Sequence, residues 1–171
     1  MDPYAFPALG HIMEPCGASG NIIRAAKPFI PRMNWHAVEK REECGEQLRK
    51  EHANLVIGDF LDKDWWPVQK IDTIITNPPY SDAEDFIRKS VKIANHTFML
   101  LRLNFLSSSK RVDLFNRFMP DVYVLPNRPS FTGEGTDSTD YGWFHWTKGR
   151  IVPEGKIQVL SDTPASERRG G

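Results

Sequence analysis

Short apolar runs alternate with amphipathic segments along the whole chain. The runs are rich in branched aliphatic and aromatic side chains, which is typical of buried strands. Seven strands are predicted, over residues 11–14, 35–38, 53–57, 71–76, 98–101, 122–125 and 143–146. Helical spacing predicts helices over residues 21–26, 42–51, 81–94 and 110–118. This alternation indicates an α/β fold, with a mostly parallel seven-stranded sheet and helices on both faces.

The capping and turn residues between these elements are consistent with one domain. Ser81 followed by Glu84 has the spacing of a capping box, so we expect Ser81 to begin the third helix. We expect one domain over residues 1–160 and a disordered tail over residues 161–171, where turn formers and charges gather. In open α/β sheets ligands bind beyond the carboxyl ends of the strands, so we searched for chemistry there.

Composition narrows the class of protein. The chain has 171 residues, with 40% hydrophobic and 26% charged residues, as globular domains do. No apolar run approaches the roughly 20 residues of a membrane span, and no signal peptide is evident, so we expect a cytoplasmic protein without a membrane partner. Cys16 and Cys44 are too far apart for a typical metal motif, and no metal is expected. The net charge of zero argues against binding nucleic acid by bulk electrostatics.

The first strand ends in the sequence Glu-Pro-Cys-Gly-Ala-Ser-Gly. Glu14, Pro15, Cys16, Gly17 and Gly20 are therefore candidates for a cofactor loop, in which the two glycines let a ligand approach the backbone. A carboxylate at the start of this turn repels phosphate and suits an ammonium group. An ordinary structural turn explains the motif equally well.

Acidic residues also follow the second and third strands. Glu39, next to Lys40, has the position from which a carboxylate accepts hydrogen bonds from ribose hydroxyls. Asp59 is placed to accept from an adenine amino group, with Phe60 or Ile57 against the ring. Each residue alone is explained as well by a helix-terminal or turn carboxylate. Together the three acidic positions suit a ligand with an ammonium group, a ribose and an adenine, which describes S-adenosylmethionine.

The fourth strand ends in Asn77-Pro78-Pro79-Tyr80. This tetrapeptide resembles the catalytic motif of S-adenosylmethionine-dependent methyltransferases that act on amino and amide nitrogens. The resemblance covers roughly residues 12–146 and implies a Rossmann-like methyltransferase fold, with Asn77 also lying against the cofactor. The segment 128–133, continuing to Asp140 and Tyr141, is similar to small phage-type adenine-specific DNA methyltransferases, which implies a host cytoplasm.

The motif suits methylation of an exocyclic amino nitrogen, whose lone pair is delocalised into the ring. The Asn77 side-chain oxygen and the Pro78 carbonyl can accept from its two hydrogens and free the lone pair, while the prolines stiffen the loop. Tyr80 offers a face for a planar target. The DNA adenine N6 group is the expected target, reached by flipping the base out of the duplex. Further substrate-binding candidates are Lys110, Arg111, Arg128 and Phe131.

Three alternatives stay open. The same chemistry on an amino group of RNA, or on a protein glutamine amide, uses the same tetrapeptide. A non-catalytic partner subunit with a cofactor fold is the third. No separate target-recognition domain is visible, so a homodimer or a separate specificity partner is plausible. The basic residues also have a simpler explanation as solvated helix faces.

Overall fold

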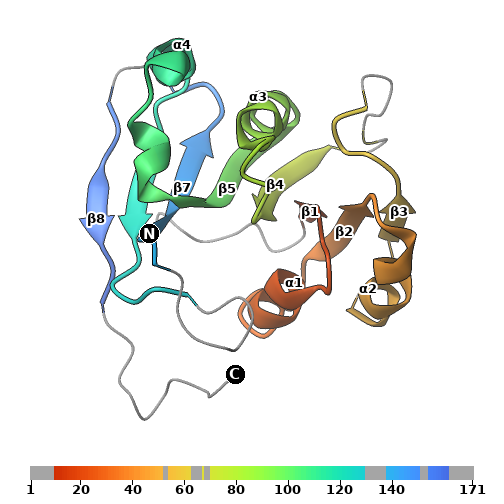
Figure 1. The fold of residues 1–171 in the computed structure, drawn as a ribbon. Helices are drawn as coiled ribbons and strands as arrows, with labels where there is room; N and C mark the ends of the chain where they lie inside the picture. Colours follow the sequence, from red (N-terminus) through yellow and green to blue (C-terminus); the bar gives the residue numbers. More distant parts are fainter. Residues whose placement is uncertain are drawn as a thin grey trace.

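The computed structural model describes residues 10–51, 54–62, 67, 70–129, 138–150 and 154–161. Within them eight strands form one sheet with four α-helices around it (Figure 1). The strands are β1 (His11–Pro15), β2 (Asn34–Glu39), β3 (Asn54–Ile57), β4 (Ile71–Thr76), β5 (Ala94–Arg102), β6 (Asp121–Val124), β7 (Tyr141–Thr147) and β8 (Ile157–Val159). The helices are α1 (Asn21–Ala26), α2 (Gly45–Glu51), α3 (Ala83–Ile93) and α4 (Val112–Arg117).

The sheet has the strand order β3-β2-β1-β4-β5-β7-β6-β8. Strands β1 to β5 are parallel, and β7 runs antiparallel between β5 and β6. The strand order reverses between β1 and β4, where Met13 pairs with Ile74. A reversal of this kind leaves a crevice at the carboxyl ends of the two strands, where ligands of such sheets bind.

Apolar side chains cover both faces of the sheet and form two cores. Helices α1 and α2 lie on one face, where Ile23 and Leu48 pack on Ile12 and Trp35. Helices α3 and α4 lie on the other, where Ile87 and Leu114 are among the buried residues of the larger core (Figure 1). The prediction of a mainly parallel sheet with helices on both faces is confirmed, because alternate side chains of β1 supply both cores.

Several predicted boundaries are corrected. Strand β8 pairs with β6 and makes an eighth strand; its three residues are exposed and too few for a periodic pattern. The N-cap of α3 is Asp82, without a side-chain cap bond, so the predicted role of Ser81 is wrong. Residues Glu42–Cys44 and Ser109–Arg111 form 3-10 turns rather than the first turns of the predicted α-helices. The predicted tail lies outside the described residues beyond Ser161.

Candidate active site

The loop after β1 has a constrained backbone. Cys16 and Ala18 have positive φ angles of 77° and 44°, which non-glycine residues rarely adopt. The Cys16 and Gly17 amides donate to the Val38 carbonyl at 2.7 and 3.2 Å, which ties the loop to the end of β2. Strain of this kind persists only where surrounding contacts hold it, and it gathers at functional sites.

The two glycines of this loop lie close to helix α2. A Cβ at Gly17 would lie 2.9 Å from Leu48 Cδ2, and a Cβ at Gly20 would lie 2.9 Å from Glu51 Cγ. Both positions therefore face α2, and Gly20 also has a φ of 75°. We conclude that these glycines allow α2 to pack against the loop, and that Cys16 is the loop residue that lines a cavity.

Glu14 is buried at the end of β1, with 2% of its surface exposed. Its Oε2 atom has no hydrogen-bond partner in the described part of the chain. Burial raises the pKa of Glu14 well above 4.5; a backbone hydrogen bond from Ile23 opposes this rise, and the Glu39 carboxylate adds to it. A buried carboxyl group with an unused oxygen is suited to pairing with a cation that enters the site.

Glu39, at the end of β2, is also buried but is already hydrogen-bonded. Ala18 N donates to Oε2 at 2.7 Å, and Arg41 donates to Oε1 from its backbone N at 2.9 Å and its Nε at 3.0 Å. Burial acts to raise the pKa of Glu39, but the hydrogen bonds from Arg41 and Ala18 outweigh it and lower the pKa. Each carboxylate oxygen can accept more than one hydrogen bond, so Glu39 keeps capacity for a ligand hydroxyl.

Asp59 lies at the turn after β3, with 40% of its side chain exposed. Lys40 Nζ is 2.8 Å from its Oδ2 atom, and Leu61 N donates to its Oδ1 atom at 2.8 Å. The hydrogen bond from Lys40 is the main cause of the lowered pKa of Asp59. The predicted cofactor residue Lys40 therefore binds Asp59 directly.

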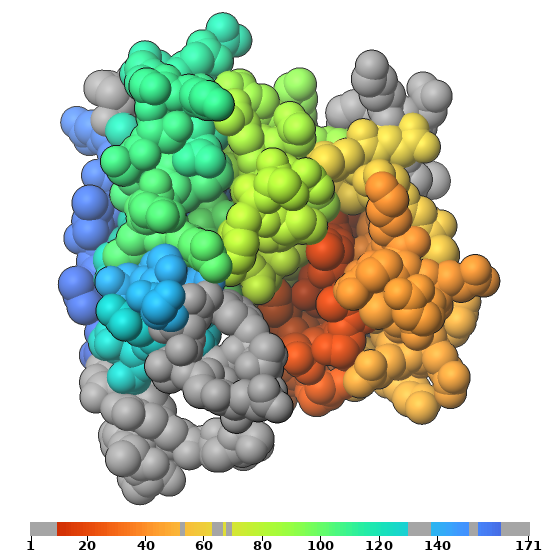
Figure 2. Space-filling model, viewed as in Figure 1, coloured from red at the N-terminus to blue at the C-terminus, as the bar shows by residue number. Residues whose placement is uncertain are grey.

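Glu39 and Asp59 share one cavity of about 90 Å³ with the turn after β4. Its walls include Cys16, Glu39, Lys40, Asp59, Phe60 and Pro79. In Figure 2 the surface over α3 adjoins that over the loop after β1, and the Thr76 hydroxyl donates to the Pro15 carbonyl. The structure thus brings part of the predicted cofactor set and Pro79 to one place, at the carboxyl ends of β1 to β4, whereas Glu14, Asn77 and Tyr80 are not among the residues that line this cavity.

Asn77 follows β4 directly and has a buried side-chain oxygen. Its Oδ1 atom has no hydrogen-bond partner in the described part of the chain. Pro78 is buried, and the Pro79 carbonyl accepts from Asp82 N at 3.0 Å, which closes the turn before α3. An unsatisfied buried acceptor costs free energy, and Asn77 Oδ1 is therefore free to accept from a donor that a ligand brings.

Tyr80 is held by two other side chains. Its hydroxyl donates to the Tyr141 hydroxyl at 2.7 Å, and the Arg102 guanidinium lies 4.4 Å from the centre of its ring. Arg102 Nε in turn donates to the Tyr141 hydroxyl at 3.1 Å. These contacts fix the orientation of Tyr80, and the residue remains 39% exposed.

The predicted substrate residues are only partly brought together. Arg111 and Tyr80 line a common hollow at the carboxyl end of β5. Lys110 is exposed in the 3-10 turn beside Arg111, and Arg128 forms an ion pair with Asp140 at 2.9 Å. Phe131 lies outside the described residues.

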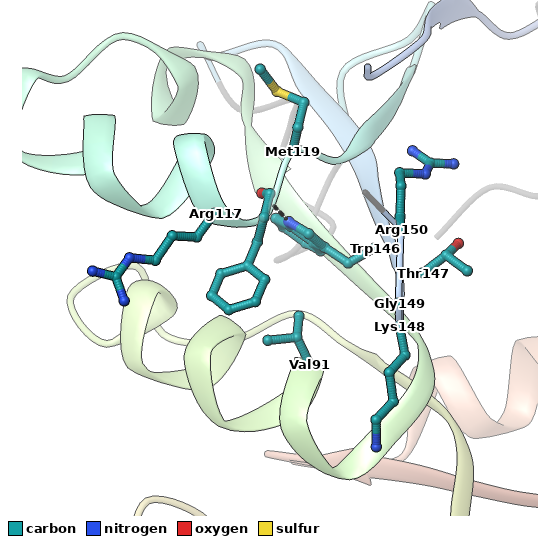
Figure 3. Close-up of a pocket in the computed structure, with 9 residues that line it drawn as sticks. Val91, Arg117, Met119, Trp146, Thr147, Lys148, Gly149 and Arg150 are labelled. Carbon is teal, nitrogen blue, oxygen red and sulfur yellow. Dashed lines mark hydrogen bonds between the residues drawn. The ribbon is translucent and has the colours of Figure 1, made fainter. Parts of the chain in front are cut away.

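A second hollow, of about 220 Å³, lies at the opposite end of the sheet, beside the end of β7 (Figure 3). Val91 and Trp146 form its apolar part, and Trp146 Nε1 donates to the Phe118 carbonyl at 2.9 Å. Arg117, Lys148 and Arg150 surround it, but Figure 3 shows their charged ends pointing in different directions. No converging polar set favours this hollow as the site of chemistry.

Sequence reasoning missed several residues of the main cavity and its surroundings. Val38, Gly58, Leu61, Asp82 and Phe86 also line the cavity, while Arg41 binds Glu39. Their positions at strand ends and in the first turns of helices could have indicated that they line the cavity. Their residue types, however, are equally common in cores and turns, so the sequence does not single them out. Tyr141 was quoted only within a sequence resemblance, and nothing local indicates that it meets Tyr80.

The described residues contain no helix that is long and apolar enough to cross a membrane. They also contain no group of three His, Cys, Asp or Glu side chains arranged to hold a metal ion. Burial raises the pKa of the Cys16 thiol to about 11, so this thiol is neutral at ordinary pH. A thiol of that kind is a poor nucleophile, and we assign it a packing contact in the cavity wall.

Comparison with family models gives no match, and comparison with curated proteins gives none either. Solved structures do share the fold. A candidate RNA methyltransferase of Pyrococcus horikoshii has a TM-score of 0.63 at 13% identity, over 81% of this chain and 73% of that one. A dimethyladenosine transferase of Plasmodium falciparum has a TM-score of 0.61 at 14% identity, over 83% of this chain and 56% of that one. TrmK of M. capricolum, in complex with S-adenosyl-homocysteine, has a TM-score of 0.58 at 8% identity, over 90% of this chain and 66% of that one.

The chain spans less than two thirds of the length of the last two proteins. Identities this low show the fold alone, and they agree with the strand order of the sheet and with helices on both of its faces. The chain therefore has the Rossmann-like fold that these methyltransferases share.

Proposed function

We propose that the protein is an S-adenosylmethionine-dependent methyltransferase that transfers a methyl group to the exocyclic N6 amino group of adenine in DNA. The observation that carries this proposal is the unpartnered, buried Oδ1 atom of Asn77. It stands at the end of β4, two residues before Pro79, which lines a cavity together with Cys16, Glu39 and Asp59. An acceptor in that place suits a target that brings N–H donors.

The cofactor fits the residues at the ends of β1, β2 and β3. The unused Oε2 atom of Glu14 suits the ammonium group, and pairing with it would offset the cost of a buried charge. Glu39 is placed for the ribose hydroxyls, and Asp59 for the adenine amino group above Phe60. The solved structure of TrmK with S-adenosyl-homocysteine supports this ligand class on the same fold.

When bound, S-adenosylmethionine supplies an electrophilic methyl group on its sulfonium. Asn77 Oδ1 and the Pro78 carbonyl would each accept a hydrogen bond from the target amino group, which would free the nitrogen lone pair for methylation. The surplus proton of the methylated nitrogen would pass to water. A preorganised acceptor contributes most when it needs no rearrangement, and the two prolines provide that.

Tyr80 is suited to hold the target ring. Its hydroxyl is fixed by Tyr141 and one face of its ring by Arg102, so an adenine would stack on the accessible part. Stacking of a base on an aromatic ring contributes about 1–3 kcal/mol, which offsets part of the cost of unstacking the base from a duplex. A planar base gains more from this surface than a glutamine amide does.

The test is to identify the methylated product. The wild-type protein is incubated with tritiated S-adenosylmethionine and, separately, duplex DNA, single-stranded DNA, ribosomal RNA and a protein extract. The product is then digested and identified by mass. We expect N6-methyladenine from DNA, formed at least about a hundredfold more slowly by an Asn77→Ala variant. Label in RNA or in protein glutamine would replace the proposed substrate, and absence of label in all four would favour a non-catalytic partner subunit.

A further inference from the structure

A hollow of about 320 Å³ lies beside Tyr80, separate from the cavity of the predicted cofactor residues. Cationic and hydroxyl-bearing side chains form most of its wall. These are Arg102, Ser107, Ser108 and Arg111, and the Asn104 amide lies beside them. Such a wall offers hydrogen-bond donors and positive charge to whatever occupies it, which suits an anion.

Arg111 is fixed in this wall. Its Nη1 donates to the Phe105 carbonyl at 3.1 Å, and its guanidinium lies 4.0 Å from the centre of the Phe105 ring. Phe105 is buried in the larger core, so the guanidinium rests on a rigid support. No carboxylate among the described residues forms an ion pair with Arg111, and its charge is therefore not neutralised by that part of the protein.

The backbone between Arg102 and Arg111 shapes the hollow. Two 3-10 turns, Leu103–Leu106 and Ser109–Arg111, leave Ser107 and Ser108 at the bend between them. Ser107 N donates to the Asn104 carbonyl at 3.0 Å, and Arg111 N donates to the Ser108 carbonyl at 3.1 Å. These bonds close the segment on itself, so the two hydroxyls and the Arg111 guanidinium are presented together.

Arg102 connects the hollow to the proposed target site. Its guanidinium covers one face of the Tyr80 ring, and both residues line the hollow. An anion bound here therefore lies next to the ring on which the target would stack. In a nucleotide the phosphate is attached to the sugar that carries the base, so base and phosphate are neighbours. A glutamine side chain carries no such anion.

We propose that this hollow binds one backbone phosphate of a nucleic acid, next to the nucleotide whose base lies against Tyr80. The inference rests on the proposed function and gives that function a nucleic-acid substrate. Arginine and hydroxyl donors are the groups that proteins most often direct at phosphate oxygens. With a net charge of zero for the whole chain, binding must come from local subsites of this kind rather than from a broad basic surface.

The experiment compares Arg111→Gln with Arg32→Gln. Both remove one positive charge. Arg32, however, is exposed in the loop before β2, at the amino ends of the parallel strands, whereas the hollow lies at their carboxyl ends. Dissociation constants for a DNA duplex are measured over a range of salt concentrations with S-adenosylhomocysteine present. We expect Arg111→Gln to weaken binding about tenfold and to reduce the slope of log K against log salt by about 0.9. Arg32→Gln should change neither.

A second variant guards against a folding defect in Arg111→Gln. Ser107 is exposed, so Ser107→Asp places a carboxylate at the hollow without disturbing the core, and it should weaken binding by a similar factor. If both variants bind DNA as Arg32→Gln does, the phosphate subsite is overturned, and methyl transfer by the wild type would leave the proposed function standing. Weakened binding by both variants, with no methyl transfer by the wild type, would sustain the subsite and overturn the proposed function. A wild-type protein that binds neither DNA nor RNA overturns both.

Discussion

Two pairs of polar side chains at the carboxyl ends of the strands differ in whether the protein itself already donates hydrogen bonds to them. At the ends of β2 and β3, Glu39 and Asp59 accept hydrogen bonds from Ala18, Arg41 and Lys40. At the ends of β1 and β4, Glu14 and Asn77 each keep a buried oxygen without a partner in the described part of the chain.

The difference separates two tasks. Carboxylates that are held by the protein keep their charge and orientation, and they need only add a ligand hydroxyl or amino group. Buried oxygens without partners cost stability in the free protein, and a ligand that donates to them recovers that cost. We therefore assign the ribose and adenine of the cofactor to the ends of β2 and β3, and its ammonium group and the target amino group to the ends of β1 and β4.

The largest effect is expected from Asn77→Ala. Turnover should fall about a hundredfold or more, as it does when a preorganised polar group is removed, while cofactor affinity stays within a factor of two or so. Because the lost oxygen has no partner, the unfolding temperature should not fall as it would for a satisfied polar group. Initial rates, calorimetry and thermal melts measure these. Asn116→Ala, on the exposed side of α4, is the control, and near-normal turnover would remove Asn77 from the mechanism.

Glu14→Gln keeps the shape of the side chain and removes its charge. We expect cofactor affinity to fall by about 2–3 kcal/mol, because a hydrogen bond to a charged group is lost. Calorimetry with S-adenosylhomocysteine measures this, with Glu46→Gln on the surface of α2 as control. Equal affinities of the two variants would place the ammonium group elsewhere.

The same variant tests the pH dependence of stability. The pKa of Glu14 in the folded protein is raised above its ordinary value of 4.5. Its contribution to stability is therefore complete below pH 4.5 and is lost as the pH rises through the folded pKa. Glu14→Gln should escape this loss, so its unfolding free energy relative to wild type should increase as the pH rises above 4.5. Urea titrations from acid to neutral pH show this, and a constant difference would contradict it.

Asp59→Ala should have a smaller effect. Its carboxylate is partly exposed and paired with Lys40, so we expect a loss of about 1 kcal/mol in cofactor affinity, at the low end for a removed polar partner. Turnover at saturating cofactor should not change. Calorimetry measures this, with Glu46→Ala as control. If the Asp59→Ala variant binds the cofactor as tightly as wild type, the adenine ring does not bind in this cavity.

Arg41→Gln should have the smallest effect. The backbone amides of Arg41 and Ala18 still bind Glu39, and the ion pair is half exposed, so affinity should fall by less than about 1 kcal/mol. A loss as large as that of Glu14→Gln would mean that the guanidinium itself contacts the ligand, and the contrast between the two pairs would no longer hold.

The order of strands and helices could be predicted from the sequence, because the spacing of apolar residues and the turn residues are properties of each local segment. Strand β4 and helix α1 have the predicted bounds. The approach of the ends of β1 and β4, where Thr76 bonds Pro15, follows from the parallel sheet, so the strand-end residues could be found without coordinates. Strand β8 and the 3-10 turns could not, because the strand is short and exposed and each turn continues into an α-helix.

The internal partners of the site were beyond sequence reasoning. Lys40 and Asp59 are 19 residues apart, and Tyr80 and Tyr141 are 61 apart, so only the fold brings them together. The close approach of Leu48 and Glu51 to the glycines of the loop after β1 also could not be predicted from local sequence. Tertiary packing, which local patterns do not encode, decides each of these cases.

The most direct measurement is an experimental structure of the protein with S-adenosylhomocysteine. We expect the ligand's amino group against Glu14 Oε2, its adenine between Phe60 and Asp59, and its sulfur toward Asn77 Oδ1. A ligand bound in the hollow beside Trp146, or one that leaves Glu14 and Asn77 without contact, would contradict this expectation.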